Sequence, residues 1–233
     1  KNWLRGRLAF ASQVRGPADS LVAWYRHTLD LLCHKEFGGS PHPSRVLIMS
    51  LSKTDKRVLP SVMWIVQVYD EVKNEVAQGT AFALLDYGLV TCHHVIEEAL
   101  APSHSVTVRP GYDPQQQYSA TIGHNSKQHD IALLKTNAPM TCHLERLTPP
   151  PAEHSTVILA GFPHWSNSAH GMWSTNAQIV QRKVASTVCQ LRVDTTISSG
   201  ASGGAAIFEG KAFGLITHGP ENLILPNSVT SLQ

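Results

Sequence analysis

From Val46 onward the chain is built of short apolar or alternating stretches, separated by glycine, asparagine and proline. Each stretch has the length of a β-strand, and almost none has the spacing of an amphipathic helix. In chain order they are VMWIVQV, GTAFALL, GLVTC, SVTVR, YSATIG, DIALLK, STVILAG, NAQIVQRKV, VCQLRVD, GAAIF, KAFGLIT and ENLILP. Six precede the proline-rich segment 148–153 and six follow it. This pattern predicts an all-β fold of two six-stranded antiparallel β-barrels.

The N-terminal part has a different texture. Residues 17–37 place apolar side chains at helical spacing, Pro17 suits a first helical turn, and Gly38 and Gly39 end the pattern. We expect a helical extension or linker over residues 1–45 and a β-domain over 46–233. Within that domain the first barrel is expected at about 60–136 and the second at about 154–226. The helix suits packing or linking, and a regulatory role stays open.

Composition excludes several partners. The 233 residues carry a net charge of +2 and no run of lysine and arginine, so a nucleic-acid partner is not expected. The apolar stretches are shorter than the ~20 residues that a membrane span needs. Because the chain starts at Lys1 and its opening lacks an apolar signal core, we expect it to be a piece of a longer protein.

The cysteines are too few for a disulfide scaffold in a chain of this length. We expect Cys33, Cys92, Cys142 and Cys189 to be reduced and mostly buried. Reduced thiols favour an intracellular, cytoplasmic setting.

Two of the chemically informative residues stand at strand ends. In GTAFALLDYGLVTCHHVI, a turn at Tyr87-Gly88 joins two strand-like runs, and the second run delivers His94. An imidazole on a rigid strand end is suited to work as a general base. In HDIALLK, Asp130 stands just before an apolar strand, where its carboxylate can accept the Nδ1 proton of His94 and hold the ring in one tautomer.

The third informative residue is Ser202, in SSGASGGAAIF. The glycines around it allow a sharp turn that exposes the hydroxyl. The same turn can point the amide N–H groups of Gly200 and Ser202 into one concavity, an oxyanion hole. The strand after Ser202 and the order His, Asp, Ser do not suit an α/β-hydrolase, which needs a helix after the serine and the histidine last.

Neighbouring residues offer rival interpretations. His93 lies beside the predicted base, and we expect it to be structural. Ser199 lies in the same loop as Ser202 but lacks the following Gly-Gly, so it is expected to shape a pocket wall. Three consecutive residues, Cys92 to His94, do not easily converge on one zinc ion, and no CxxC or HxxxH accompanies them. We expect neither a metal nor an organic cofactor.

These motifs resemble those of the chymotrypsin/trypsin superfamily of serine proteases, of the compact bacterial or intracellular type. VTCHHV is similar to V-T-A-A-H, DIALLK to its counterpart, GASGG to G-D-S-G-G, and GFP at 161–163 to G-Y-P. The resemblance covers roughly residues 60–226. It implies a triad of His94, Asp130 and Ser202, with the oxyanion amides on Gly200 and Ser202.

The resemblance also places the substrate-binding residues. It implies that Thr217, His218 and Gly219 pair with the substrate backbone and that Thr196 forms the floor of the specificity pocket. An uncharged floor does not support cleavage after basic residues. Ala201 stands where zymogens have an aspartate and Val95 where they have a cysteine, so we expect control by a partner or by the N-terminal segment rather than by propeptide removal.

The sequence therefore predicts a serine endopeptidase that acts on a protein or peptide substrate and forms a partner-regulated domain of a larger protein. The alternative is a catalytically idle pair of barrels that serves as a protein-binding module.

Overall fold

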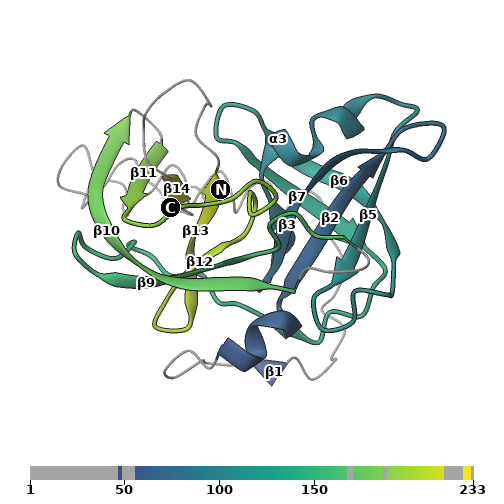
Figure 1. The fold of residues 1–233 in the computed structure, drawn as a ribbon. Helices are drawn as coiled ribbons and strands as arrows, with labels where there is room; N and C mark the ends of the chain where they lie inside the picture. The colour runs from purple at the N-terminus through teal and green to yellow at the C-terminus, as the bar shows by residue number, and fades with distance from the viewer. Residues whose placement is uncertain (1–46, 49–55, 167–170, 186–187, 218–227, 232–233) are drawn as a thin grey trace, which may run out of the picture. The chain divides into compact units, whose positions relative to one another are not determined.

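Two closed barrels of six strands each contain most of the residues that the computed structural model describes (Figure 1). The described residues are 47–48, 56–166, 171–185, 188–217 and 228–231. They all belong to one unit of the chain, His42–Leu232. The predicted N-terminal helix at 17–37 lies outside them.

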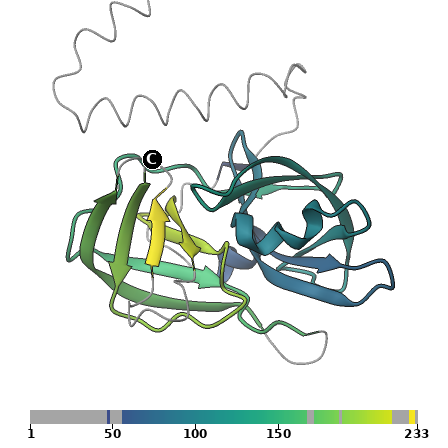
Figure 2. The same ribbon diagram turned by 90° about the horizontal axis from the view of Figure 1, so that it is seen from above.

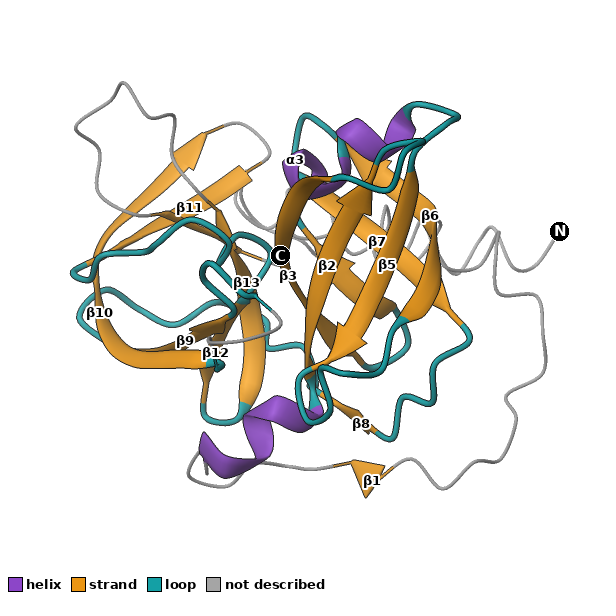
Figure 3. Cartoon of the chain, turned by 45° about the vertical axis from the view of Figure 1, so that its right-hand side comes forward, coloured by secondary structure: helices purple, strands orange, loops and turns teal. Residues whose placement is uncertain are grey.

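The first barrel joins its strands in the order β2-β3-β4-β7-β6-β5. Every neighbouring pair for which a register is assigned is antiparallel, as Figure 3 lets the reader follow. The strands are β2 (Met63–Tyr69), β3 (Glu75–Leu84), β4 (Gly88–Thr91), β5 (Ser105–Pro110), β6 (Tyr118–Ser126) and β7 (Ile131–Thr136).

The second barrel joins its strands in the order β10-β11-β14-β13-β12-β9, again antiparallel (Figure 2). The strands are β9 (Thr156–Gly161), β10 (Trp173–Ala185), β11 (Val188–Val193), β12 (Ala205–Phe208), β13 (Lys211–Thr217) and β14 (Ser228–Ser231).

Only short elements accompany the barrels among the described residues. They are the 3-10 turns η1 (Lys56–Ser61) and η2 (Glu98–Leu100), the helical turn α3 (His93–Ile96), and the two-residue strands β1 (Leu47–Ile48) and β8 (Cys142–His143). β1 and β8 pair in parallel. No described helix is long and apolar enough to cross a membrane.

Large apolar side chains fill the barrels because the strand sequences are rich in β-branched and aromatic residues. Trp64 and Phe82 are fully buried in one apolar cluster, which also includes Phe162, and Phe213 is fully buried in a second cluster. Each such side chain contributes roughly 1.5–3 kcal/mol on burial. The first cluster contains residues of both barrels, so it also holds the two barrels together.

The predicted fold class of two six-stranded antiparallel barrels is confirmed. The turn at Tyr87-Gly88 is also present: the Tyr87 amide donates to the Leu84 carbonyl at 3.1 Å, and Gly88 has a φ of 83°. The last strand differs from the prediction. The closing strand of the second barrel, β14, is the polar segment Ser228–Ser231, whereas the predicted stretch 221–226 lies outside the described residues.

Candidate active site

His94 is the exposed residue of a short helical turn, and the other residues of this turn are buried. The chain leaves β4 at Thr91 and enters α3, where Val95 and Ile96 are buried. The His94 side chain keeps 39% of its surface exposed. Buried neighbours therefore fix the backbone, while the imidazole faces solvent.

Asp130 meets His94 from the turn before β7. Its carboxylate accepts the His94 backbone amide at 3.0 Å and contacts the ring Nδ1 at 2.8 Å and 3.0 Å. A carboxylate in this position assigns the ring proton to Nδ1, which leaves Nε2 with a free lone pair. His93, by contrast, is buried, and neither of its ring nitrogens has a hydrogen-bond partner among the described residues. Asp130 thus contacts the second histidine, the residue that the sequence pattern proposes as the base.

The backbone around Asp130 departs from regular geometry. Asp130 has a φ of 51°, a left-handed conformation that aspartate tolerates better than most residues. A bulge between Ile122 and Asn125 shifts the β6–β7 register just before this turn. Bulges of this kind re-aim side chains next to functional sites.

An exposed ion pair joins the same two segments. Lys127, in the turn before Asp130, contacts Glu97, just after α3. Their hydrogen bond and charges lower the pKa of Glu97 and raise the pKa of Lys127. Both side chains are exposed, so this pair is a minor addition to the contacts that Asp130 makes with His94.

Ser202 lies in a turn in which neighbouring positions require glycine. Gly200 and Gly203 have φ values of 86° and 81°. A Cβ on Gly203 would lie 2.1 Å from the Thr80 carbonyl oxygen, and one on Gly204 would lie 2.3 Å from that of Ala160. The Gly-Gly that follows Ser202 is therefore required by close approach to β3 and β9.

Thr80 of β3 fixes this turn to the first barrel. Its amide donates to the Ser202 carbonyl at 2.8 Å, and its hydroxyl donates to the Gly200 carbonyl at 2.9 Å. The same hydroxyl accepts the Phe162 amide at 2.9 Å, and the Thr80 carbonyl accepts the Thr91 hydroxyl at 2.7 Å. Thr80 is fully buried. The sequence analysis missed this residue, because a threonine in the apolar run GTAFALL carries no local signal of these contacts.

Three of the five backbone amides from Gly200 to Gly204 donate hydrogen bonds. Ala201 donates to Ser198, Gly203 to Ile216 and Gly204 to Ala201. Among the described residues, no hydrogen-bond partner is recorded for the amides of Gly200 and Ser202. These are the two amides that the sequence analysis assigns to an oxyanion hole. Partnerless amides in a buried turn are suited to bind an anionic oxygen.

The turn with Ser202 and the helical turn with His94 both approach β3, but no hydrogen bond joins the two side chains among the described residues. A Cβ on Gly79 would lie 2.6 Å from the methyl groups of Val95 and 3.1 Å from the Ser202 carbonyl oxygen, so Gly79 separates α3 from the serine turn. No hydrogen bond links His94 to Ser202 within the described part of the chain. Such bonds often tighten only when substrate is bound.

The predicted substrate-binding residues are only partly described. Thr217 is buried at the end of β13, and Thr196 is exposed before the serine turn. His218 and Gly219 lie outside the described residues. Ser199, the rival serine, is exposed, and its carbonyl accepts the His164 amide at 3.1 Å.

One group of side chains has the composition of a metal site. Cys92 Sγ, a ring nitrogen of His94 and a carboxylate oxygen of Asp130 lie within 4.8 Å of one another. The group differs from the three consecutive residues that the sequence analysis considered, because Asp130 takes the place of His93. It shares two members, His94 and Asp130, with the contact between those residues.

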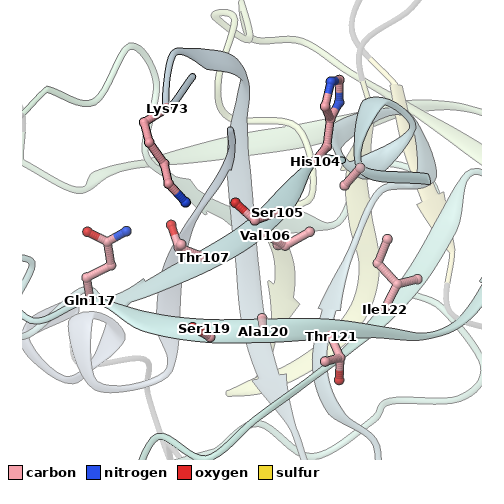
Figure 4. Close-up of a pocket in the computed structure, with 11 residues that line it drawn as sticks. Lys73, His104, Ser105, Val106, Thr107, Gln117, Ser119, Ala120, Thr121 and Ile122 are labelled. Carbon is pink, nitrogen blue, oxygen red and sulfur yellow. The ribbon is translucent and has the colours of Figure 1, made fainter. Parts of the chain in front are cut away.

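A separate hollow of about 600 Å³ lies along β5 and β6 (Figure 4). It is lined mainly by small and hydroxyl-bearing side chains, with Lys73 and His104 at its edges. None of the predicted site residues lines it. The candidate active site is therefore defined by the contacts of His94, Asp130 and the serine turn, and not by this hollow.

Comparison with known proteins gives one family and a set of similar structures. Residues 79–215 match the family described as trypsin-like peptidase domain, a segment that includes His94, Asp130 and Ser202. No curated protein sequence matches the chain significantly.

Two crystal structures of the Rv3671c protease from M. tuberculosis are similar to this chain. The active form is 21% identical, with a TM-score of 0.61 and coverage of 83% of each chain. The inactive form is also 21% identical, with a TM-score of 0.56 and coverage of 83% of this chain and 92% of that chain. At this identity the likeness shows a shared double-barrel fold.

Proposed function

Because this chain belongs to the trypsin-like peptidase family, we propose that it is a serine endopeptidase in which Ser202 is the nucleophile, His94 the general base and Asp130 the residue that orients the base. The observation that carries the proposal is the contact of His94 Nδ1 with Asp130 at 2.8 Å. That contact leaves Nε2 as the free ring nitrogen, on a helical turn beside the strand that holds the serine turn.

The reaction begins with proton transfer. Nε2 of His94 takes the Ser202 hydroxyl proton as the oxygen attacks the substrate carbonyl carbon. The imidazolium that forms is stabilised by the Asp130 carboxylate, which stays ionised. The carbonyl oxygen becomes an oxyanion and accepts hydrogen bonds from the Gly200 and Ser202 amides.

Collapse of this intermediate breaks the peptide bond. His94 gives its proton to the leaving amine, and an acyl-enzyme remains on Ser202. Water then repeats the sequence with the same base, so the acid is released and Ser202 is restored. These steps call for no metal or organic cofactor.

We propose a protein or peptide substrate, bound extended by main-chain pairing next to β13. Thr217 ends this strand and His218 and Gly219 come next in the sequence, while Thr196 would supply an uncharged pocket floor. Regulation by a partner, or by further parts of a longer chain, belongs to the same proposal, because Ala201 and Val95 replace the groups that zymogen activation uses.

A fluorophosphonate probe tests the proposed function, since it reacts only with an activated serine. We expect stoichiometric labelling that is lost in Ser202→Ala and kept in Ser199→Ala, the matched control from the same turn. Absence of labelling in folded protein, with or without its partner, would instead support the idle binding module. Labelling that persists in Ser202→Ala would assign the nucleophile elsewhere.

A further inference from the structure

We propose that Cys92, His94 and Asp130 form an inhibitory site for a soft divalent cation such as Zn²⁺. The site itself stands on the positions of three side chains. Only its inhibitory consequence rests on the proposed function, because the cation would occupy the ring nitrogen that orients the base.

The three ligand groups lie close together. Cys92 Sγ, a ring nitrogen of His94 and an Asp130 oxygen lie within 4.8 Å of one another, and His94 Nδ1 is 2.8 Å from Asp130 Oδ2. Zinc binds sulfur at about 2.3 Å and nitrogen or oxygen at about 2.0–2.2 Å. A cation would draw the sulfur slightly closer to the other two atoms, and water could fill a fourth position.

Cys92 and His93 are the two residues that differ from the motif V-T-A-A-H, and only Cys92 brings a thiol. In VTCHHV the cysteine stands where V-T-A-A-H has its first alanine, so the thiol is an addition beside the predicted base. Thiolate, imidazole and carboxylate together favour zinc and similar soft cations over magnesium or calcium.

The thiol faces a negative charge. Cys92 is fully buried, and its Sγ contacts the Ile216 carbonyl oxygen at 3.3 Å. Burial and the nearby Asp130 carboxylate raise the pKa of this thiol. Without a cation the thiol therefore stays protonated, whereas a divalent cation between sulfur and carboxylate would neutralise both negative charges.

Solvent reaches the site from the side of the predicted base. The His94 and Asp130 side chains are 39% and 30% exposed, while Cys92 forms the buried end of the group. A cation can thus meet the exposed ligands first and the thiol last.

Binding would remove the general base without any change of oxidation state. The Cys92 thiol releases its proton to solvent and bonds to the cation as thiolate. The cation takes the Nδ1 lone pair, so the ring proton moves to Nε2 and the hydrogen bond from Nδ1 to Asp130 is lost. With its proton on Nε2, the imidazole has no lone pair left to accept the Ser202 proton.

Direct Zn²⁺ titration of the Ser202→Ala protein by calorimetry tests the site without any need for catalysis. We expect Cys92→Ala in this background to weaken binding by at least about tenfold, since losing even an outer partner of a metal ligand costs about 10–100-fold in affinity. Cys142→Ala, which removes another described thiol, is the matched control and should bind like the parent. Cys92→Ser, nearly isosteric, covers the case in which alanine loosens the core.

Activity provides the second readout. In proteins that keep Ser202, and relative to each protein's own metal-free rate, Zn²⁺ should inhibit the wild-type chain and its Cys142→Ala variant, EDTA should restore both activities, and Mg²⁺ should not inhibit. Equal Zn²⁺ affinity in the Cys92 variants and their parent would overturn the proposal, because the cation would then sit on other ligands. If the wild-type chain is inactive without metal, yet Zn²⁺ binding depends on Cys92, the proposed function fails and the site stands.

Discussion

The two halves of the candidate active site are held by different kinds of contact. His94 is oriented by a side chain, since the Asp130 carboxylate holds both its ring and its amide. Ser202 is positioned through backbone groups, by Thr80 and by glycines that pack against neighbouring carbonyl oxygens. The first half therefore depends on the charge of one residue, and the second on shape and on hydrogen bonds from the other barrel.

Removing the charge of Asp130, on which the orientation of His94 depends, should cause the largest fall in kcat. Asp130→Asn preserves the shape of the carboxylate but favours the wrong tautomer of His94, so we expect kcat to fall about 10⁴-fold. Steady-state hydrolysis of a peptide ester or amide measures this. A loss of less than about tenfold would show that Asp130 does not orient the base.

A side chain at Gly203 should disrupt the serine turn, which is the half of the site that depends on shape. Gly203→Ala forces a Cβ to within 2.1 Å of the Thr80 carbonyl oxygen at a φ of 81°. We expect loss of one oxyanion donor or more, and thus a fall in kcat of at least about 10²–10³-fold. Gly171→Ala is the matched control, because no atom of the described residues, apart from its chain neighbours, lies within 4 Å of the added Cβ. Similar activity in both variants would contradict the account of the serine turn.

Thr80 links the two halves and should give an intermediate effect. Thr80→Val leaves the Gly200 carbonyl and the Phe162 amide without their partner, at about 1–3 kcal/mol each. We expect kcat to fall by about 10–100-fold with KM little changed, and Thr80→Ser to restore most of it. A peptide boronate should lose affinity in parallel with kcat. Equal losses of kcat in the valine and serine variants would show that Thr80 does not position the serine turn.

The exposed ion pair should matter least. Lys127→Ala removes the charge that lowers the pKa of Glu97, so this pKa should rise towards its ordinary value in an NMR titration. Since an exposed pair contributes about 0–1 kcal/mol, kcat should change by less than about threefold. A larger loss would mean that Lys127 helps to hold Asp130 in place.

The same contrast explains what could be predicted from sequence. Alternating apolar runs predict the barrel strands because one strand face is buried, and His94, Asp130 and Ser202 stand in local motifs at strand ends. Thr80 could not be found in this way, because it bonds to Gly200 and Phe162, which are far along the chain. β14 carries the polar sequence SVTS, which gives no apolar signal. The convergence of Cys92 on Asp130 also depends on the fold, since α3 and the turn before β7 meet only in space.

A crystal structure with a bound peptide boronate would test most directly whether the two halves form one catalytic site. We expect a covalent bond from boron to Ser202 Oγ. One boronate oxygen should lie about 2.7–3.1 Å from the Gly200 and Ser202 amide nitrogens, and His94 Nε2 should lie within hydrogen-bond distance of the bound boronate. Boron on Ser199, or a boronate oxygen that points away from both amides, would contradict this account.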